Sequence, residues 1–137
     1  MKITTSYAGN MRFKSRESSA VVMDAAVEGG GTGEAPTPKQ MVLHGLAGCT
    51  GMDVAAILKK KKVDYEDFTI DIEAEQTQYH PRVFKTIKIS YRFVADPAAR
   101  PDIERAVALS RENFCGVSAM LEKTAEITDE IIITPPA

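Results

Sequence analysis

Two cysteines are the residues of this chain whose side chains most readily do chemistry. Cys49 and Cys115 are the only cysteines among 137 residues. Cysteine is a nucleophile in its thiolate form, and two thiols that meet in a fold can form a redox pair. Buried cysteines are also common as small, inert hydrophobic residues. The residue types alone therefore leave two interpretations open, a redox pair or two inert core residues.

The immediate surroundings of the two cysteines differ. Cys115 stands at the start of an expected short helix, where unpaired backbone amides and the helix dipole favour a thiolate, whereas Cys49 lies in the middle of a long helix and receives little such help. His44 is five residues before Cys49 and points well around the helix, so we expect an interior histidine and not a catalytic base. Asp53 is one turn beyond Cys49, on nearly the same face, where its charge would raise the thiol pKa. We interpret Asp53 as a structural or partner-contacting residue.

Other kinds of chemical site have little support. His44 and His80 are the only histidines and no two cysteines are closely spaced, so we expect no metal site. The glycine-rich segment 29–33 lacks the Gly-Lys-Ser/Thr ending of a phosphate loop, and we expect no nucleotide or other cofactor. Two cysteines are also too few for the disulfide framework of a small secreted domain.

The reactive residues must be positioned by a long central helix, expected over residues 37–61. Thr37 can cap its start, Pro38 suits the first turn, and Gln40 stands at the third position of a capping box. Residues 41–58 are apolar or small almost all round, and a helix without a polar face must be buried on every side.

Three glycines on this helix indicate a close neighbour. Gly45, Gly48 and Gly51 recur at three-residue spacing, which costs helix propensity but lets another backbone approach. His44 and Asp53 interrupt the apolar run and argue against a membrane span. Because one small sheet cannot cover such a helix completely, we expect a homodimer.

The remaining elements predict an α+β domain that spans residues 1–137, with an antiparallel sheet around the buried helix. Period-two alternation and turn residues predict three short strands near 2–7, 11–14 and 20–23, and two longer strands at 68–75 and 86–93 joined by a hairpin loop at 78–82. Amphipathic patterns predict helices at 102–114 and 115–123. A last strand is expected at 130–134.

Charge and composition exclude further classes. The net charge of −2 and the pI of about 5.7 provide no broad basic field for nucleic acid or an anionic membrane. The one basic run, lysines 59–62, is interpreted as a solvated helix end and is the only support for a nucleic-acid binder. No secretory signal pattern is present, so we expect a cytoplasmic protein.

Several motifs in a characteristic order resemble one known family. A Pro-Thr-Pro-Lys-Gln-Met stretch at 36–41 opens the helix that carries Cys49, Pro-Arg-Val-Phe stands at 81–84, and Asn-Phe-Cys-Gly-Val-Ser at 113–118 carries Cys115. This arrangement is similar to the OsmC/Ohr (organic hydroperoxide resistance) family over essentially the whole chain. The resemblance implies an intertwined α+β homodimer that acts as a thiol-dependent peroxidase.

The resemblance also implies roles for individual residues. Cys49 would attack the O–O bond of an organic hydroperoxide and Cys115 would resolve the resulting sulfenic acid as an intramolecular disulfide. In peroxidase members an arginine from the N-terminal strands activates the reactive cysteine, and a glutamate ten residues before that cysteine holds the arginine. Arg12 is the best candidate for the arginine, with Arg16 as the alternative, but the glutamate position is occupied by Lys39. Lys39 could itself lower the Cys49 pKa and donate to the departing alkoxide.

Two functions from different classes therefore follow. The first is an organic hydroperoxide peroxidase with an apolar pocket, for which Met41, Met52 and Phe114 are candidate walls, and with a small thiol or a dihydrolipoyl protein as reductant. The second is a non-enzymatic OsmC-like dimer that binds a small apolar ligand or senses oxidation. Lys39 at the glutamate position favours the second.

Overall fold

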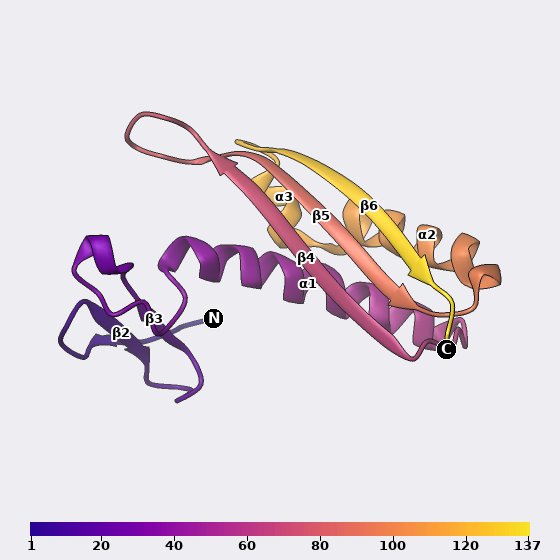
Figure 1. Ribbon diagram of the computed structural model, residues 1–137, viewed down its shortest axis with the longest axis horizontal. Coiled ribbons are helices and arrows are strands. Elements are labelled where there is room, and N and C mark those ends of the chain that lie inside the picture. The colour runs from indigo at the N-terminus through magenta and orange to yellow at the C-terminus, as the bar shows by residue number, and fades with distance from the viewer. The chain divides into compact units, whose positions relative to one another are not determined.

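The computed structural model describes residues 1–137, which form two compact units, 1–44 and 45–137 (Figure 1). Helix α1 (Pro38–Lys60) crosses the boundary between them. The expectation of one domain stays a prediction.

The N-terminal unit is built on an antiparallel meander, as expected. Strands β1 (Thr5–Tyr7), β2 (Arg12–Ser15) and β3 (Val22–Asp24) pair in that order, and a short 3-10 turn (Val27–Gly29) follows them. The chain then folds back on β3 so closely that a Cβ at Gly31 would lie 2.0 Å from the Ala25 carbonyl oxygen. No side chain fits there, so this position requires glycine.

The start of α1 confirms the predicted capping box. The Thr37 backbone N–H donates to Gln40 Oε1 at 2.8 Å, and the Gln40 backbone N–H donates to Thr37 Oγ1 at 3.3 Å. Two of the amides that a helix start leaves unpaired are thus satisfied reciprocally. The helix bounds also agree with the prediction to within a residue or two.

The expectation that α1 is buried on every side is wrong for the single chain. Its buried residues form one stripe at four-residue spacing, Leu46, Thr50, Val54 and Leu58. The physical reason is that one small chain has only enough sheet to cover one face of this helix.

By length and composition α1 could also cross a membrane, and 22% of the apolar window is buried within this chain. This is weak evidence for a membrane span, because the core helix of a soluble protein passes the same test.

The C-terminal unit contains a three-stranded sheet in the order β4 (Asp67–Gln76), β5 (Phe84–Val94), β6 (Glu126–Thr134). Strands β4 and β5 form the predicted hairpin, but β6 runs parallel to β5. The prediction of an antiparallel sheet is therefore wrong for this pair. The physical reason is the connection. The helical segment between β5 and β6 carries the chain back to the end of the sheet at which β5 begins, so β6 runs in the same direction as β5.

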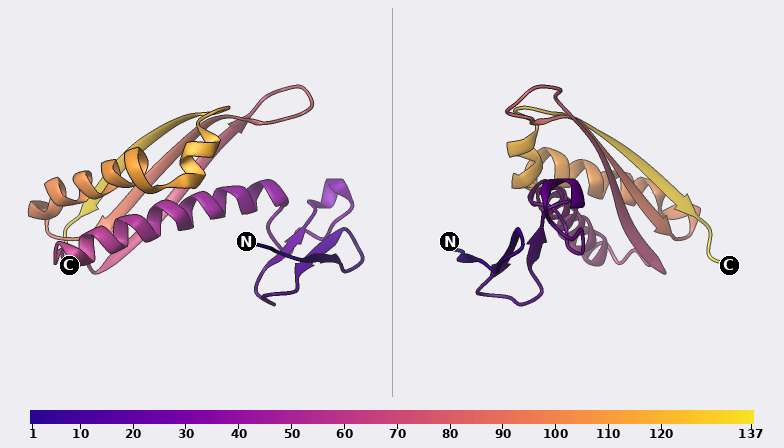
Figure 2. Two further views of the ribbon diagram at one scale, coloured as in Figure 1. Left: turned by 180° about the vertical axis from the view of Figure 1, so that it is seen from behind. Right: turned by 60° about the vertical axis from the view of Figure 1, so that its left-hand side comes forward.

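That connection consists of α2 (Arg100–Leu109), a single π-helical turn (Ser110–Phe114) and α3 (Gly116–Leu121), preceded by a short 3-10 turn (Pro97–Ala99). The expected helix at 102–114 is thus divided, and the last strand begins four residues earlier than expected. Both views in Figure 2 show α2 and α3 on the face of the sheet that α1 also covers. The core between these layers includes Leu46, Val54, Leu58, Ile87, Ile89, Tyr91, Phe93, Ile103, Ala106 and Val107.

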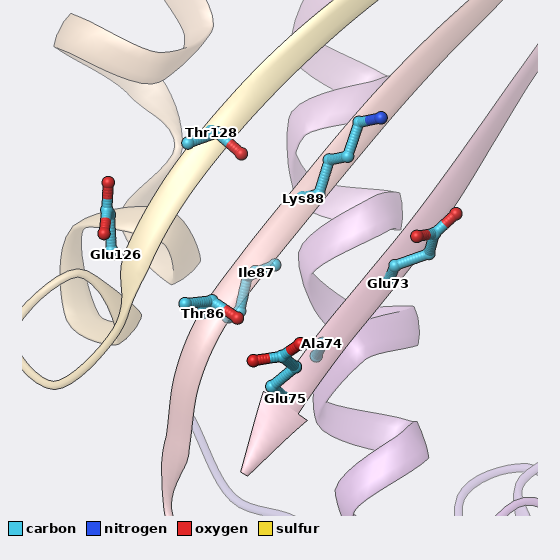
Figure 3. A pocket seen from close by; sticks show the side chains of 8 residues that line it. All are labelled: Glu73, Ala74, Glu75, Thr86, Ile87, Lys88, Glu126 and Thr128. Atoms are coloured by element: carbon cyan, nitrogen blue, oxygen red, sulfur yellow. The ribbon is translucent and has the colours of Figure 1, made fainter.

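The opposite face of the sheet is polar. Glu73, Glu75 and Lys88 point away from the helices, as Figure 3 shows, and line a shallow hollow with Thr86 and Thr128. Ion pairs such as Lys88–Glu130 (2.8 Å) cross neighbouring strands on this face. This surface is a solvated one, typical of a sheet with one covered face.

Candidate thiol site

The fold brings the two cysteine sulfurs together. Cys49 lies on α1 and is half-buried, and Cys115 precedes α3 and is 2% exposed. The two sulfur atoms and one carboxylate oxygen of Asp53 all lie within 4.8 Å of one another. Both thiols are free. A pair of thiols at this separation can be joined by modest movement of the side chains.

The π-helical turn sets the position of Cys115. The Cys115 backbone N–H donates to the Ser110 carbonyl at 2.7 Å, a wider turn than that of an α-helix. Cys115 then serves as the N-cap of α3, and the Ser118 backbone N–H donates to its sulfur at 3.4 Å. Ser118 Oγ also donates to the Cys115 carbonyl at 2.9 Å. The expected amide at the Cys115 thiol is therefore present.

Cys49 also receives a backbone donor, which its mid-helix position did not predict. The Val117 backbone N–H hydrogen-bonds to the Cys49 thiol and acts to lower its pKa. Burial, the Cys115 thiol and the Asp53 charge act in the opposite direction, and together they raise the pKa of Cys49 above its ordinary value. The predicted effect of Asp53 on the thiol is thus present, and within this unit the thiol form of Cys49 is favoured.

A chain of buried hydroxyl groups ends at Asp53. Ser110 Oγ donates to Asp53 Oδ2 at 3.0 Å, and the Thr50 hydroxyl lies 2.9 Å from Ser110 Oγ and 2.8 Å from Tyr91 Oη. Each hydroxyl has one hydrogen, and Ser110 gives its hydrogen to the carboxylate. Thr50 must therefore donate to Ser110, and Tyr91 to Thr50. Because burial raises the pKa of Tyr91 to about 12, this tyrosine stays a donor across the ordinary pH range.

The predicted cationic residues lie in the N-terminal unit. Arg12 contacts the buried Asp24 carboxylate through Nε at 3.4 Å and pairs with Glu34, and its Nη2 lies 3.3 Å from Thr32 Oγ1. Asp24 and Glu34 thus hold the arginine, although position 39 is a lysine. The alternative arginine, Arg16, donates to Ser6 Oγ at 2.7 Å, and Lys39 is exposed in the first turn of α1.

Several other side chains considered for the site are more exposed than expected. His44 is exposed in this chain, so the expectation of an interior histidine is wrong for the monomer. Among the candidate pocket walls, Met52 is 75% and Phe114 is 60% exposed, whereas Met41 is half-buried. These apolar side chains lack cover within the chain.

Sequence spacing did not reveal the cluster of Cys49, Asp53 and Cys115. The four-residue interval between Cys49 and Asp53 was a signal, because it places both on one side of a helix. The third member comes from a different element, and 66 residues separate the cysteines (115 minus 49). These three donors are the residues that could hold a thiophilic metal ion.

Comparisons with known proteins identify a family and a curated relative. The family model described as OsmC-like protein matches residues 31–130. Protein YhfA of Escherichia coli (strain K12) is 34% identical over 102 residues, which cover 74% of this chain and 76% of that protein.

Solved structures share the fold at lower identity. A protein of Aquifex aeolicus VF5, described as hypothetical, has a TM-score of 0.82 at 22% identity and covers 99% of this chain and 97% of its own. An organic hydroperoxide resistance protein OsmC of Legionella pneumophila has a TM-score of 0.71 at 17% identity. The match covers 96% of this chain and 97% of that protein's chain. These likenesses show the α+β fold.

Proposed function

We propose, from the premise that this chain belongs to the OsmC-like protein family, that it is a thiol-dependent peroxidase for organic hydroperoxides. The observation that carries the proposal is the meeting of the Cys49 and Cys115 sulfurs within 4.8 Å. A peroxidase that works through an internal disulfide needs a reactive thiol with a second thiol in reach.

The proposed reaction begins at Cys49, the more exposed of the two thiols. Its thiolate attacks one oxygen of ROOH and the O–O bond breaks. With one proton taken up by the alkoxide, the products are a Cys49 sulfenic acid and ROH. The Cys115 thiol then attacks the sulfenic acid sulfur, and water leaves as the disulfide forms. A small thiol or a dihydrolipoyl protein returns both cysteines to thiols.

Activation of Cys49 requires more than its own unit supplies. The Val117 amide favours the thiolate, but the pKa of Cys49 is raised overall. We therefore keep Arg12 and Lys39 as the proposed cationic groups of the reaction. The contacts of Arg12 with Asp24 and Glu34 support this role, because they can replace the glutamate that is missing at position 39.

A homodimer is part of the proposal. The exposed side of α1 carries Met52 and, with Phe68 and Ile70 of β4, lines a shallow apolar hollow that also includes Ala47, Gly48, Gly51 and Ala55. A Cβ at Gly45 or Gly48 would meet no atom within 4 Å in this chain, so neither glycine is explained by packing within it. A second copy is the proposed neighbour. We assign the dimer to the cytoplasm, without a nucleic-acid or membrane partner.

One observation favours a second function, that of a ligand-binding or oxidation-sensing dimer without efficient turnover. Burial, the Cys115 thiol and the Asp53 charge raise the pKa of Cys49, which disfavours the thiolate, and a thiol reacts more slowly with peroxide than a thiolate does. Lys39 in place of the family glutamate points in the same direction.

The two functions are separated by measuring peroxide consumption in the presence of a dithiol reductant. The proteins compared side by side are wild type, Cys49→Ser and Cys115→Ser. A peroxidase loses nearly all activity without Cys49. Without Cys115, and with the reductant left out, it completes a first turnover and accumulates the Cys49 sulfenic acid. Consumption by wild type no faster than that by Cys49→Ser would reject the enzyme and leave the binding or sensing function.

A further inference from the structure

We propose that Cys49, Asp53 and Cys115 form a binding site for a thiophilic divalent cation, zinc foremost, with water as the fourth ligand. Two elements supply the three donors. Cys49 and Asp53 project from the same side of α1, one turn apart, and Cys115 comes from the N-cap of α3. Their sulfur and oxygen atoms lie within 4.8 Å of one another.

The donor set and its spacing suit zinc. Thiolate sulfur binds zinc at about 2.3 Å and carboxylate oxygen at about 2.0–2.2 Å. In a tetrahedral site these bond lengths place the ligand atoms roughly 3.5–3.8 Å apart. From within 4.8 Å, the three donors would therefore need to approach one another by at most about 1.3 Å, which side-chain rotations can provide.

Asp53 is oriented in the way that metal-binding carboxylates usually are. One of its oxygens accepts the hydrogen bond from Ser110, which is in turn held by Thr50 and Tyr91. These three hydroxyl residues are fully buried. Hydrogen bonds of this kind fix the direction of a ligand and are typical of the outer shell of metal sites.

Both sulfurs face backbone donors in the first turn of α3. The Val117 backbone N–H donates a hydrogen bond to the Cys49 sulfur, and the Ser118 backbone N–H donates one to the Cys115 sulfur. Such N–H donors stabilise negative charge on sulfur, and zinc requires both cysteines as thiolates. The same turn can therefore support two metal-bound thiolates.

The charge balance of the cluster also favours a cation. Two thiolates and one carboxylate whose ligand atoms lie within 4.8 Å of one another repel one another. A divalent ion would neutralise most of this charge, and because binding displaces thiol protons, the affinity should rise with pH.

The site shares its cysteines with the proposed peroxidase but does not depend on it. A Cys49–Cys115 disulfide removes two of the three ligands, so the metal-bound and disulfide forms exclude one another. Metal binding by the reduced protein can be measured without any peroxide. Failure of the peroxidase and failure of the metal site therefore give different results.

The test titrates the reduced, metal-free chain with Zn²⁺ in competition with a chromophoric chelator, and repeats the titration with Co²⁺. We expect one ion per chain, protection of both thiols from iodoacetamide, and a thiolate-to-cobalt charge-transfer absorption. Asp53→Asn should bind Zn²⁺ at least 10-fold more weakly, and Ser110→Ala roughly 10-fold more weakly through loss of the oriented carboxylate. Asp67→Asn, an exposed carboxylate on β4, is the matched control and should bind as wild type does.

Oxidised wild type provides a measurement that does not depend on how any variant folds. Its disulfide should abolish Zn²⁺ binding, and reduction should restore it. Binding that survives oxidation, equal affinities of Asp53→Asn and Asp67→Asn, or no competition with the chelator by the reduced chain would overturn the proposal.

Discussion

The backbone N–H of Val117 donates a hydrogen bond to the Cys49 thiol, so the first turn of α3 acts on a residue carried by α1. The next backbone N–H, that of Ser118, donates a hydrogen bond to the Cys115 sulfur. One turn of backbone thus supports both thiols, and the Asp53 carboxylate opposes it at Cys49. Loss of the Val117 hydrogen bond should therefore raise the pKa of Cys49, and loss of the Asp53 charge should lower it.

The first prediction concerns the pH dependence of Cys49. Because its pKa is raised, the thiolate population and the alkylation rate should keep rising above the pH at which an ordinary cysteine has ionised. Asp53→Asn removes a charge that raises this pKa, so its alkylation profile should move to lower pH. The rate is measured with iodoacetamide in a chelator on the reduced chain with Cys115 retained, by mass spectrometry of the Cys49 peptide, because Cys115 also helps to raise this pKa. An unchanged profile relative to Asp67→Asn would contradict the electrostatic role of Asp53.

The second prediction is an intrachain disulfide. Stoichiometric organic hydroperoxide should convert the free thiols to a Cys49–Cys115 bond, since their sulfurs need to approach from within 4.8 Å to about 2.05 Å. Peptide mapping without reduction detects the linked peptides. Cys115→Ser should instead leave a Cys49 sulfenic acid that a dimedone reagent traps. Only intermolecular links in wild type would show that Cys115 does not resolve Cys49.

The third prediction concerns Lys39. Arg12 already pairs with Asp24 and Glu34, so a glutamate at position 39 would add no missing anchor and would remove a proposed cation. We therefore expect Lys39→Glu to lower the peroxidase kcat/KM by roughly 10-fold or more, the size of a lost charge-assisted contact. Lys60→Glu, an exposed lysine at the other end of α1, is the charge-matched control. Higher activity in Lys39→Glu would instead assign Lys39 an inhibitory role.

The fourth prediction is a dimer held through the exposed side of α1. Sedimentation at micromolar concentration should show about twice the 14.9 kDa chain mass. Met52→Glu should weaken the dimer by roughly 100-fold or more, because it would bury an unpaired charge. A wild-type monomer would contradict the second-copy proposal, and an undisturbed Met52→Glu dimer would place the interface elsewhere.

The fifth prediction tests the buried hydroxyl chain. Tyr91→Phe removes the donor to Thr50 in a fully buried position and should lower the free energy of unfolding by about 1–2 kcal/mol. Urea denaturation monitored by circular dichroism measures the change. Tyr79→Phe is the control, since Tyr79 is 78% exposed and should lose nothing measurable. Equal stability of both variants would show that the chain contributes no net stabilisation.

Local sequence was sufficient for much of this fold. The capping box of Thr37 and Gln40, the bounds of α1 and the hairpin of β4 and β5 depend on contacts only a few residues apart or on strict alternation. Such patterns act through the backbone and neighbouring side chains, so they can be predicted without the rest of the chain. The order of the motifs around Cys49 and Cys115 was also sufficient to indicate the family.

Tertiary structure alone decided the remaining features. The parallel pairing of β6 with β5 and the π-helical turn before Cys115 depend on how α2 and α3 return the chain across the sheet. The meeting of Asp53 with both sulfurs, and the donation from Val117 to Cys49, join residues that are distant in sequence. Periodicity shows which face of an element is apolar but not which distant element will cover it. That choice is made by packing and hydrogen bonding across the whole fold.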